Sequence, residues 1–471
     1  MKHSHIMILL IALSATSGNL IAEQLFVAPH GSDNIPRAQN SENSPWQTLG
    51  RATWGSTSPF SPNTAEAAQA GDVVIVKAGV YTTTQTLGQR DLPTYNPANT
   101  GTAGNPIVFR AASGEDVILQ GFSGTTDGAL IGANDRSYIT WDGFIINEPA
   151  IATSPDTGPV VVWNSDNITL QNLTIIGKTA AWNDNHNGIR LEFATNSVVR
   201  SNRISGIRNA PNNGNGAAIM VYDSEGIIFE YNEIWDSGGG IYLKGRNPGS
   251  FTLRYNVLHH IDGAAITVLG VADGGGSSNE IYQNLVYDSR EGIIFSSIDA
   301  AGPADVDVVN NTFHNLSSAG VYIDDDDTGY ADLVIRNNLF TDVRTGIQAE
   351  ELPNAAALDD FNINNNMYFG FNQMARLVYS DLSLSQWQSQ TGKDTSSTAN
   401  DPLYVNQNQN DFTLSAGSPA IDEGIDLLNL QGGGTSNPIN LGAYINGTAM
   451  NDIGPQNEPV TLPSPPTITV P

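Results

Sequence analysis

The sequence predicts an all-β protein whose body is a right-handed parallel β-helix, a solenoid in which every coil contributes three short strands. Eight segments repeat one pattern, an alternating apolar strand followed by an asparagine and a second short strand. A second marker, a small residue followed by Ile or Val, keeps phase with the asparagines. Glycine (47 residues) and proline (24) are abundant and helix-length amphipathic runs are scarce, which favours short strands joined by turns.

The two markers define the repeat. The aligned asparagines are Asn172, Asn202, Asn232, Asn256, Asn284, Asn311, Asn338 and Asn366, with Asp142 at the same position one period earlier. The small residues are Gly188, Ala218, Gly240, Ala265, Gly292, Gly320 and Gly346. Two markers in phase over so many periods indicate a repeat array, whose coils would stack about 4.8 Å apart. We expect the asparagines to form one row at a corner, where this residue tolerates left-handed backbone and hydrogen-bonds its neighbours.

The two ends of the chain differ from the repeats. Residues 1–22 have the features of a signal peptide, because Lys2 precedes an apolar run that is too short to span a bilayer. We expect an N-terminal cap at 23–70 with one short strand and a helix, the β-helix at 71–370, a C-terminal cap of small strands at 371–448, and an extended Pro-rich tail at 449–471. The sequence therefore predicts a secreted protein, extracellular or periplasmic, that is a monomer without a membrane span.

The composition limits the partners. The formal net charge is −28, from 20 basic and 48 acidic residues. So acidic a surface repels nucleic acid and anionic membranes, and it repels polyanionic substrates unless a basic patch or a bound cation reverses the sign locally. Cysteine is absent from the sequence, which excludes disulfides, zinc–thiolate sites and thiol nucleophiles.

Several segments carry a resemblance to a known family. The opening FVAPHGSD, PWQTL and AGDVVIVKAGVY, the asparagine-cornered coils and the closing GSPAID resemble the secreted pectate-lyase-like β-helix superfamily over most of residues 25–445. The resemblance implies a carbohydrate site along the outer face of the strand that starts at the small–Ile marker. It does not fix the activity, because the superfamily includes lyases, hydrolases, epimerases and adhesins.

Strand alternation identifies the side chains on that outer face. Three consecutive coils present one group of outward residues: Arg190, Glu192, Tyr222, Asp223, Tyr242, Lys244 and Arg246. His186 lies in the turn just before this group. Because the chain has only 20 basic residues, three of them beside carboxylates and tyrosines form a candidate site. The structural alternative is a set of surface ion pairs that join neighbouring coils.

β-Elimination of a uronate polymer would give these residues catalytic roles. The reaction needs a neutralised carboxylate, a base that takes the C5 proton and an acid that protonates the leaving oxygen. We assign Arg190 and Arg246 to the carboxylate, Lys244 to the base, and Tyr242 or Tyr222 to the acid. Tyr222 is also expected to bind substrate, together with His186.

Calcium is the cofactor that the sequence suggests. Its ligands would be Glu192 and Asp223, or alternatively Asp324, Asp325 and Asp326 in an acidic turn. The same turn, paired with Glu350 or Glu351 one coil later, could supply the two carboxylates of a glycoside hydrolase. A solvated acidic turn without a function is the simpler interpretation.

The sequence therefore predicts an exported polysaccharide lyase that cleaves an acidic, uronate-containing glycan by β-elimination. Two alternatives stay open. One is a glycoside hydrolase that uses paired carboxylates, and the other is a non-catalytic surface protein that binds carbohydrate.

Overall fold

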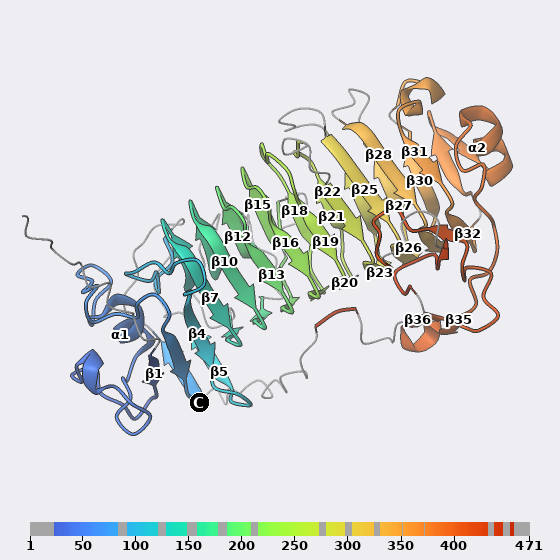
Figure 1. Ribbon diagram of the computed structural model, residues 1–471. Helices are drawn as coiled ribbons and strands as arrows, with labels where there is room; N and C mark the ends of the chain where they lie inside the picture. Colours follow the sequence, from blue (N-terminus) through green and yellow to red (C-terminus); the bar gives the residue numbers. More distant parts are fainter. Residues whose placement is uncertain are drawn as a thin grey trace, which may run out of the picture.

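The computed structural model describes residues 23–82, 92–120, 129–147, 158–177, 186–208, 215–272, 279–296, 304–324, 330–350, 352–371, 373–431, 438–445 and 453–455. The expected signal peptide and most of the Pro-rich tail lie outside these ranges. Within them the chain winds repeatedly about one axis as a parallel β-helix, which confirms the predicted fold class (Figure 1). No helix in the described part of the chain is long and apolar enough to cross a membrane.

Three sheets run along the axis, and each coil adds one strand to each of them. The first sheet contains β1 (Gln24–Val27), β2 (Val73–Val76), β4 (Ile107–Ala111), β7 (Ser137–Asp142), β10 (Asp166–Gln171), β13 (Val198–Arg200), β16 (Ile228–Glu230), β19 (Thr252–Arg254), β22 (Asn279–Tyr282), β25 (Ala304–Val309), β28 (Tyr330–Arg336) and β31 (Asn362–Asn364). The second sheet contains β3 (Gly79–Thr82), β5 (Val117–Gln120), β8 (Ile145–Asn147), β11 (Thr174–Ile176), β14 (Arg203–Ser205), β17 (Glu233–Trp235), β20 (Val257–His259), β23 (Leu285–Ser289), β26 (Thr312–Leu316), β29 (Leu339–Thr341) and β32 (Met367–Phe369).

The third sheet is the one that starts at the small–Ile markers. It contains β6 (Ile131–Asn134), β9 (Val160–Trp163), β12 (Asn187–Glu192), β15 (Ala217–Tyr222), β18 (Ile241–Leu243), β21 (Ala264–Val268), β24 (Glu291–Phe295), β27 (Ala319–Ile323), β30 (Thr345–Ala349), β33 (Ala375–Leu377) and β34 (Ser380–Leu382). All neighbouring strands of this sheet pair in parallel, including β30 with β33, except that β33 and β34 close the sheet as an antiparallel pair.

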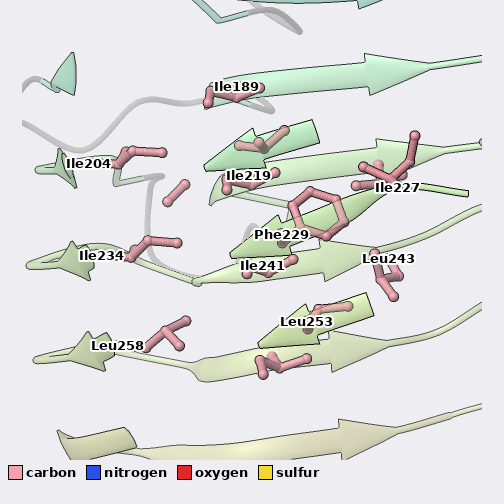
Figure 2. Close-up of a cluster of buried hydrophobic side chains, with 14 of the residues drawn as sticks. Ile189, Ile204, Ile219, Ile227, Phe229, Ile234, Ile241, Leu243, Leu253 and Leu258 are labelled. Carbon is pink, nitrogen blue, oxygen red and sulfur yellow. The ribbon is translucent and has the colours of Figure 1, made fainter. Parts of the chain in front are cut away.

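The interior is filled by apolar side chains from all three sheets. Ile189, Ile219 and Ile241 follow one another along the third sheet, and they meet Phe229 of the first sheet and Ile234 of the second (Figure 2). All five are fully buried. Because strand side chains alternate, the residues that follow these isoleucines in the third sheet point away from the core, as the sequence predicted.

The small residue before each Ile has a steric cause. A Cβ at Gly320 would lie 2.5 Å from Cδ1 of Phe340, and one at Gly292 would lie 2.6 Å from Cδ1 of Phe313. Phe313 and Phe340 stack in the second sheet with their ring centroids 5.0 Å apart. Each strand of the third sheet thus begins against a large core side chain, and close packing leaves room for only a small residue.

The asparagine row is confirmed for Asn202, Asn232, Asn256, Asn284, Asn311, Asn338 and Asn366. The main-chain N–H and Nδ2 of Asn232 both donate to Oδ1 of Asn256, at 3.0 and 2.9 Å, and the other members except the last, Asn366, repeat this arrangement. Nδ2 of Asn256 also donates to the main-chain oxygen of Phe229 (2.9 Å). The row is buried, so its amides satisfy main-chain groups that water cannot reach.

The register of the first coils differs from the prediction. Leu173, not Asn172, lies in the row, since its main-chain N–H donates to Oδ1 of Asn202 (2.9 Å). Asn172 precedes the row with a left-handed φ of 56°. One coil earlier the row position is held by Phe144 and not by Asp142. The left-handed position and the row position are adjacent, and asparagine suits both, so the pattern alone could not separate them.

The left-handed backbone belongs to the residue before each row asparagine, which corrects the expectation that the asparagine itself adopts it. These residues are Ser201, Tyr231, Tyr255, Gln283, Asn310, Asn337 and Asn365. The corner therefore uses two positions, one for the turn of the backbone and one for the hydrogen bonds.

The ends of the solenoid are covered by irregular segments and short helices. At the N-terminal end these are η1 (Arg37–Gln39) and α1 (Leu49–Trp54), whose cap is Thr48. At the other end they are η3 (Ala355–Leu358), α2 (Leu384–Thr391), η4 (Gln407–Gln409), and the strand pairs β35 (Tyr404–Asn406) with β36 (Asp411–Leu414) and β37 (Gly424–Ile425) with β38 (Pro438–Ile439). The buried carboxylate of Asp394 ends the asparagine row by accepting from Nδ2 of Asn366 (3.1 Å).

The C-terminal segment then returns along the asparagine corner. Nδ2 of Asn337 donates to the main-chain oxygen of Ile425 (2.7 Å), and Nδ2 of Asn310 donates to that of Asn440 (2.7 Å). The main-chain N–H of Gly454 donates to the oxygen of Tyr255 further back along the axis. The part of this side between the coils of Asn337 and Tyr255 is contacted in this way, and the third sheet lies on another side (Figure 1).

Candidate functional site

The candidate site lies on the outer face of the third sheet, where β12, β15 and β18 pair in register. Arg190 lies beside Met220, and Met220 beside Tyr242. A second row runs parallel to this one at the ends of the strands. It comprises Asn134, Trp163, Glu192, Tyr222 and Lys244, and is called the outer row below. Neighbours in a row are about 4.8 Å apart along the axis.

Arg190 and Glu192 form a buried ion pair. Their exposed fractions are 5% and 4%, although the sequence predicted them on a solvent-facing patch. Nε of Arg190 donates to Oε1 of Glu192 (2.5 Å), and its Nη1 donates to Oδ1 of Asn187 (3.3 Å). Separating a buried pair leaves a charge uncompensated and costs several kcal/mol, so these two side chains act as a unit.

Tyr222 lies between two cationic side chains. Cζ of Arg190 is 4.9 Å from the centroid of its ring, and Nζ of Lys244 is 5.9 Å from it. Both distances allow attraction between the cation and the ring face. Gly245, with φ 87°, leaves room for this ring, because a Cβ there would lie 3.0 Å from Cδ1 of Tyr222. Nζ of Lys244 also donates to Oδ1 of Asn215 (2.7 Å).

Arg246 and Asp223 lie at the turn that follows the outer row. Arg246 is exposed, and its main-chain N–H donates to Oδ1 of Asp223 (2.8 Å). Asp223 itself has a left-handed φ of 47°. Within the described ranges, neither Lys244 nor Arg246 forms an ion pair with a carboxylate. Two cationic groups therefore remain available to an anionic ligand at this point of the surface.

Tyr242 and His186 lie at the margin of this cluster. Tyr242 is half-buried in the row beside Met220, and His186 is buried just before β12. The main-chain oxygen of His186 accepts from Nδ2 of Asn187 (3.1 Å), and the same nitrogen donates to the oxygen of Asn215 (3.1 Å). Asn187 and Asn215 thus connect Arg190 with Lys244 through hydrogen bonds. The sequence did not predict this connection, because no pattern distinguishes these two asparagines.

The described carboxylates do not fit a calcium site. Glu192 is engaged in its ion pair, and Asp223 accepts a main-chain hydrogen bond. In the part of the chain that the structure describes, no group of three or more His, Asp or Glu side chains could hold a metal ion. The alternative ligands Asp325 and Asp326 lie outside the described residues, next to Asp324. Calcium binding stays a prediction.

The carboxylates of the hydrolase alternative lie in the same row on adjacent strands. Asp324 follows β27 and Glu350 follows β30, each two residues beyond the pair Tyr322 and Gln348. Oε1 of Glu350 accepts from Nε2 of Gln348 (2.7 Å), and its Oε2 lies 2.7 Å from Nε of Arg376. Both oxygens of Glu350 thus have partners, which makes it a poor candidate for the proton donor. Glu351 lies outside the described residues.

Sequence reasoning also missed an aromatic pair one coil before the cluster. Trp163 occupies the outer row next to Glu192, and the ring of Phe193 packs edge-on against it with centroids 5.4 Å apart. Phe193 is 46% exposed. Extending the alternation one coil toward the N-terminus would have placed Trp163 in the row.

Comparisons with known proteins agree with the fold. Residues 151–299 match the family described as the right-handed beta helix region. The chain is 24% identical over 363 residues to the uncharacterized protein YwoF of Bacillus subtilis (strain 168), a match that covers 74% of this chain and 63% of YwoF. This chain thus spans less than two thirds of that relative.

Two solved structures are similar at lower identity. Pectate lyase Pel9A superposes with a TM-score of 0.57 and 16% identity, covering 90% of this chain and 97% of its own. The GH136 lacto-N-biosidase from Eubacterium ramulus gives a TM-score of 0.47 and 12% identity, covering 80% and 67%. The chain is a right-handed parallel β-helix protein, and the predicted resemblance to the pectate-lyase-like superfamily is confirmed at the level of the fold.

Proposed function

We propose that the protein is an exported polysaccharide lyase that acts on a uronate-containing glycan at the Tyr222–Lys244 cluster. The observation that carries the proposal is the pair Lys244 and Arg246, two cations without a described carboxylate partner, on a protein of net charge −28. In so acidic a molecule, such a pair is where a polyanion can approach. The fold that the chain shares with pectate lyase Pel9A supports a polysaccharide as the ligand, and the apolar run within residues 1–22 supports export.

In this proposal each group has a role. Arg246 neutralises the uronate carboxylate, which acidifies the C5 proton, and Lys244 in its neutral form accepts that proton. The C4–O bond breaks as the C4–C5 double bond forms, and the hydroxyl of Tyr222 protonates the leaving oxygen. A neutral amine keeps two N–H donors, so Lys244 can keep its hydrogen bond to Asn215 while its lone pair faces the substrate.

Arg190 becomes a positioning residue in this proposal, not a carboxylate ligand. Its guanidinium is held by Glu192 and lies against the ring of Tyr222. The same contacts keep Tyr222 beside Lys244 without exposing Arg190 to the substrate.

The test is the appearance of the unsaturated product. The purified chain is incubated with pectate, alginate and glycosaminoglycans, with and without Ca²⁺, and the ultraviolet absorbance of the new double bond is followed. Lys244→Met should lower kcat/KM by about 100-fold or more, as expected for loss of a general base. The matched control is Lys77→Met, which removes a half-buried lysine paired with Glu42 (2.8 Å) just after β2, far from the cluster, and should leave activity unchanged.

Two results would overturn the proposal. One is the absence of unsaturated product from every glycan, and the other is full activity of Lys244→Met. Release of reducing ends without the absorbance change would favour the hydrolase alternative.

A further inference from the structure

The outer row continues past the cluster toward the N-terminal end. From Lys244 it passes Tyr222 and Glu192 to reach Trp163 on β9 and Asn134 on β6. Trp163 is three coils from Lys244, which corresponds to roughly 14 Å along the axis. An extended ligand that reaches both points would place different units of its chain at each of them.

Phe193 is unusual for its place in the fold. The residue after each outer-row member turns the chain with left-handed backbone, and Phe193 does so with φ 53°. The equivalent positions hold Asp135, Asn164, Asp223 and Gly245, which are the residue types that tolerate this conformation. Phe193 is the bulky aromatic exception among these five positions, and its ring is 46% exposed beside Trp163.

A cavity of about 270 Å³ lies one coil further toward the N-terminal end, where Asn134 pairs with Trp163. It is lined by Trp54, Pro59, Pro62, Leu92, Asn96, Ala98, Asn134, Asp135 and Arg136. Its walls thus combine apolar surface with amide and charged groups, which is the composition of a site for a small polar ligand. Nδ2 of Asn96 donates to the main-chain oxygen of Asn134 (3.2 Å), and this bond fixes the edge of the cavity to the outer row.

Carboxylates near the pair disfavour a second uronate, and the guanidinium of Arg136 on the cavity wall already donates to the main-chain oxygens of Pro97 and Asp135. Oδ1 of Asp135 accepts from Nδ2 of Asn164 (2.5 Å), directly beside Trp163. Burial would raise the pKa of Asp166, but side-chain hydrogen bonds from Asn196, Asn167 and Thr195 hold it below its ordinary value. The ionised carboxylate of Asp166 therefore repels an anionic sugar, whereas the apolar face of a neutral sugar ring can lie on Phe193.

We propose that Trp163, Phe193 and the adjoining cavity form a subsite for neutral sugar units of the glycan. The proposal rests on the proposed function in one respect, namely that Lys244 and Arg246 hold a uronate of the same chain. It names the substrate class as a heteroglycan that contains both uronate and neutral sugars, not a homopolymer of uronate.

Binding, not catalysis, tests this subsite. Tryptophan fluorescence of Lys244→Met is titrated with neutral tetrasaccharides from xylan, galactan and mannan, and with oligouronates of the same length. The same titrations are made with Phe193→Asn added, since asparagine removes the ring but tolerates the left-handed backbone. The matched control is Tyr379→Asn, which removes another exposed aromatic (61%) with left-handed backbone (φ 59°) at the far end of the third sheet.

The expected result is that at least one neutral tetrasaccharide binds, that Phe193→Asn weakens it about tenfold or more, and that Tyr379→Asn leaves it unchanged. The proposal is overturned if no neutral oligosaccharide binds at millimolar concentration, or if Phe193→Asn and Tyr379→Asn behave alike. Because cleavage is not measured, failure of the lyase proposal would show separately, as missing unsaturated product with the wild-type chain.

Discussion

Each coil has two corners with left-handed backbone, and the two corners differ in whether their side chains repeat from coil to coil. At the asparagine corner, the row from Asn202 to Asn366 repeats one buried side chain in every coil. At the corner that ends the third sheet, the backbone repeats but the side chains do not, as the change from Trp163 to Glu192, Tyr222 and Lys244 shows.

The difference follows from what each corner must satisfy. An amide at the asparagine corner bridges main-chain groups of neighbouring coils that have no access to water, so the coils from Asn202 to Asn366 all keep it, whereas Leu173 and Phe144 hold the position where the row has not yet begun. The turn after the third sheet satisfies its main-chain groups through the ladder itself, for example from the N–H of Phe193 to the oxygen of Tyr222 (3.1 Å). Side chains at this turn are not needed to satisfy main-chain groups, so the residue type can vary from coil to coil.

The strongest test of this contrast removes one amide from the row. Asn256→Ala takes away the acceptor of the N–H and Nδ2 of Asn232, leaving buried donors unpaired. We expect a loss of about 3 kcal/mol in the free energy of unfolding, measured with urea, because each unpaired buried group costs roughly 1–3 kcal/mol. The exposed Asn406, bonded to Gln409, provides the control Asn406→Ala, which should be nearly neutral. Equal effects of the two variants would contradict the structural role of the row.

A second test addresses the start of the third sheet, between the two corners. Gly320→Ala would place a Cβ 2.5 Å from Phe340 and should cost about 2 kcal/mol through overpacking. Gly417→Ala meets no atom within 4 Å and should change the free energy of unfolding by less than about 0.5 kcal/mol. If both alanines are tolerated, the small–Ile marker does not have the steric cause given above.

A third test uses the residue that ends the asparagine row. Complete burial raises the pKa of Asp394, although hydrogen bonds from Ser397, Asn366, Trp387 and Tyr368 oppose the shift. A raised folded-state pKa means that the carboxyl contributes stability below its unfolded pKa and loses it as the pH rises through the folded value. The free energy of unfolding of the wild type should therefore fall relative to that of Asp394→Asn as the pH rises from 4 to neutral. Thermal unfolding of both proteins at several pH values measures this difference. A difference independent of pH would be inconsistent with this titration.

The smallest expected effect concerns the variable corner. Phe193→Asn should change the free energy of unfolding by less than about 0.5 kcal/mol, because the ring is 46% exposed and asparagine relieves the left-handed strain. Calorimetry of this variant alongside Asn256→Ala would compare the two corners directly. A loss as large as that of Asn256→Ala would make Phe193 part of the core and remove the distinction between them.

The repeat, the small–Ile marker and the side chains that leave the core could all be predicted from the sequence. These are local properties, because a coil must repeat its inward residues to stack and alternation then fixes the outward ones. The sequence also placed Arg190, Tyr222 and Lys244 on one face of consecutive coils, as the register confirms.

How those side chains contact one another on this face depends on packing between coils, which the sequence pattern does not predict. Burial of the Arg190–Glu192 pair depends on what packs over it, and the edge-on contact of Trp163 with Phe193 joins residues one whole coil apart. The row position of Leu173 in place of Asn172 likewise depends on pairing between strands. The last two contacts join segments about thirty residues apart. The periodicity of the sequence predicts the coil, but it does not predict which of two adjacent side chains contacts the neighbouring coil.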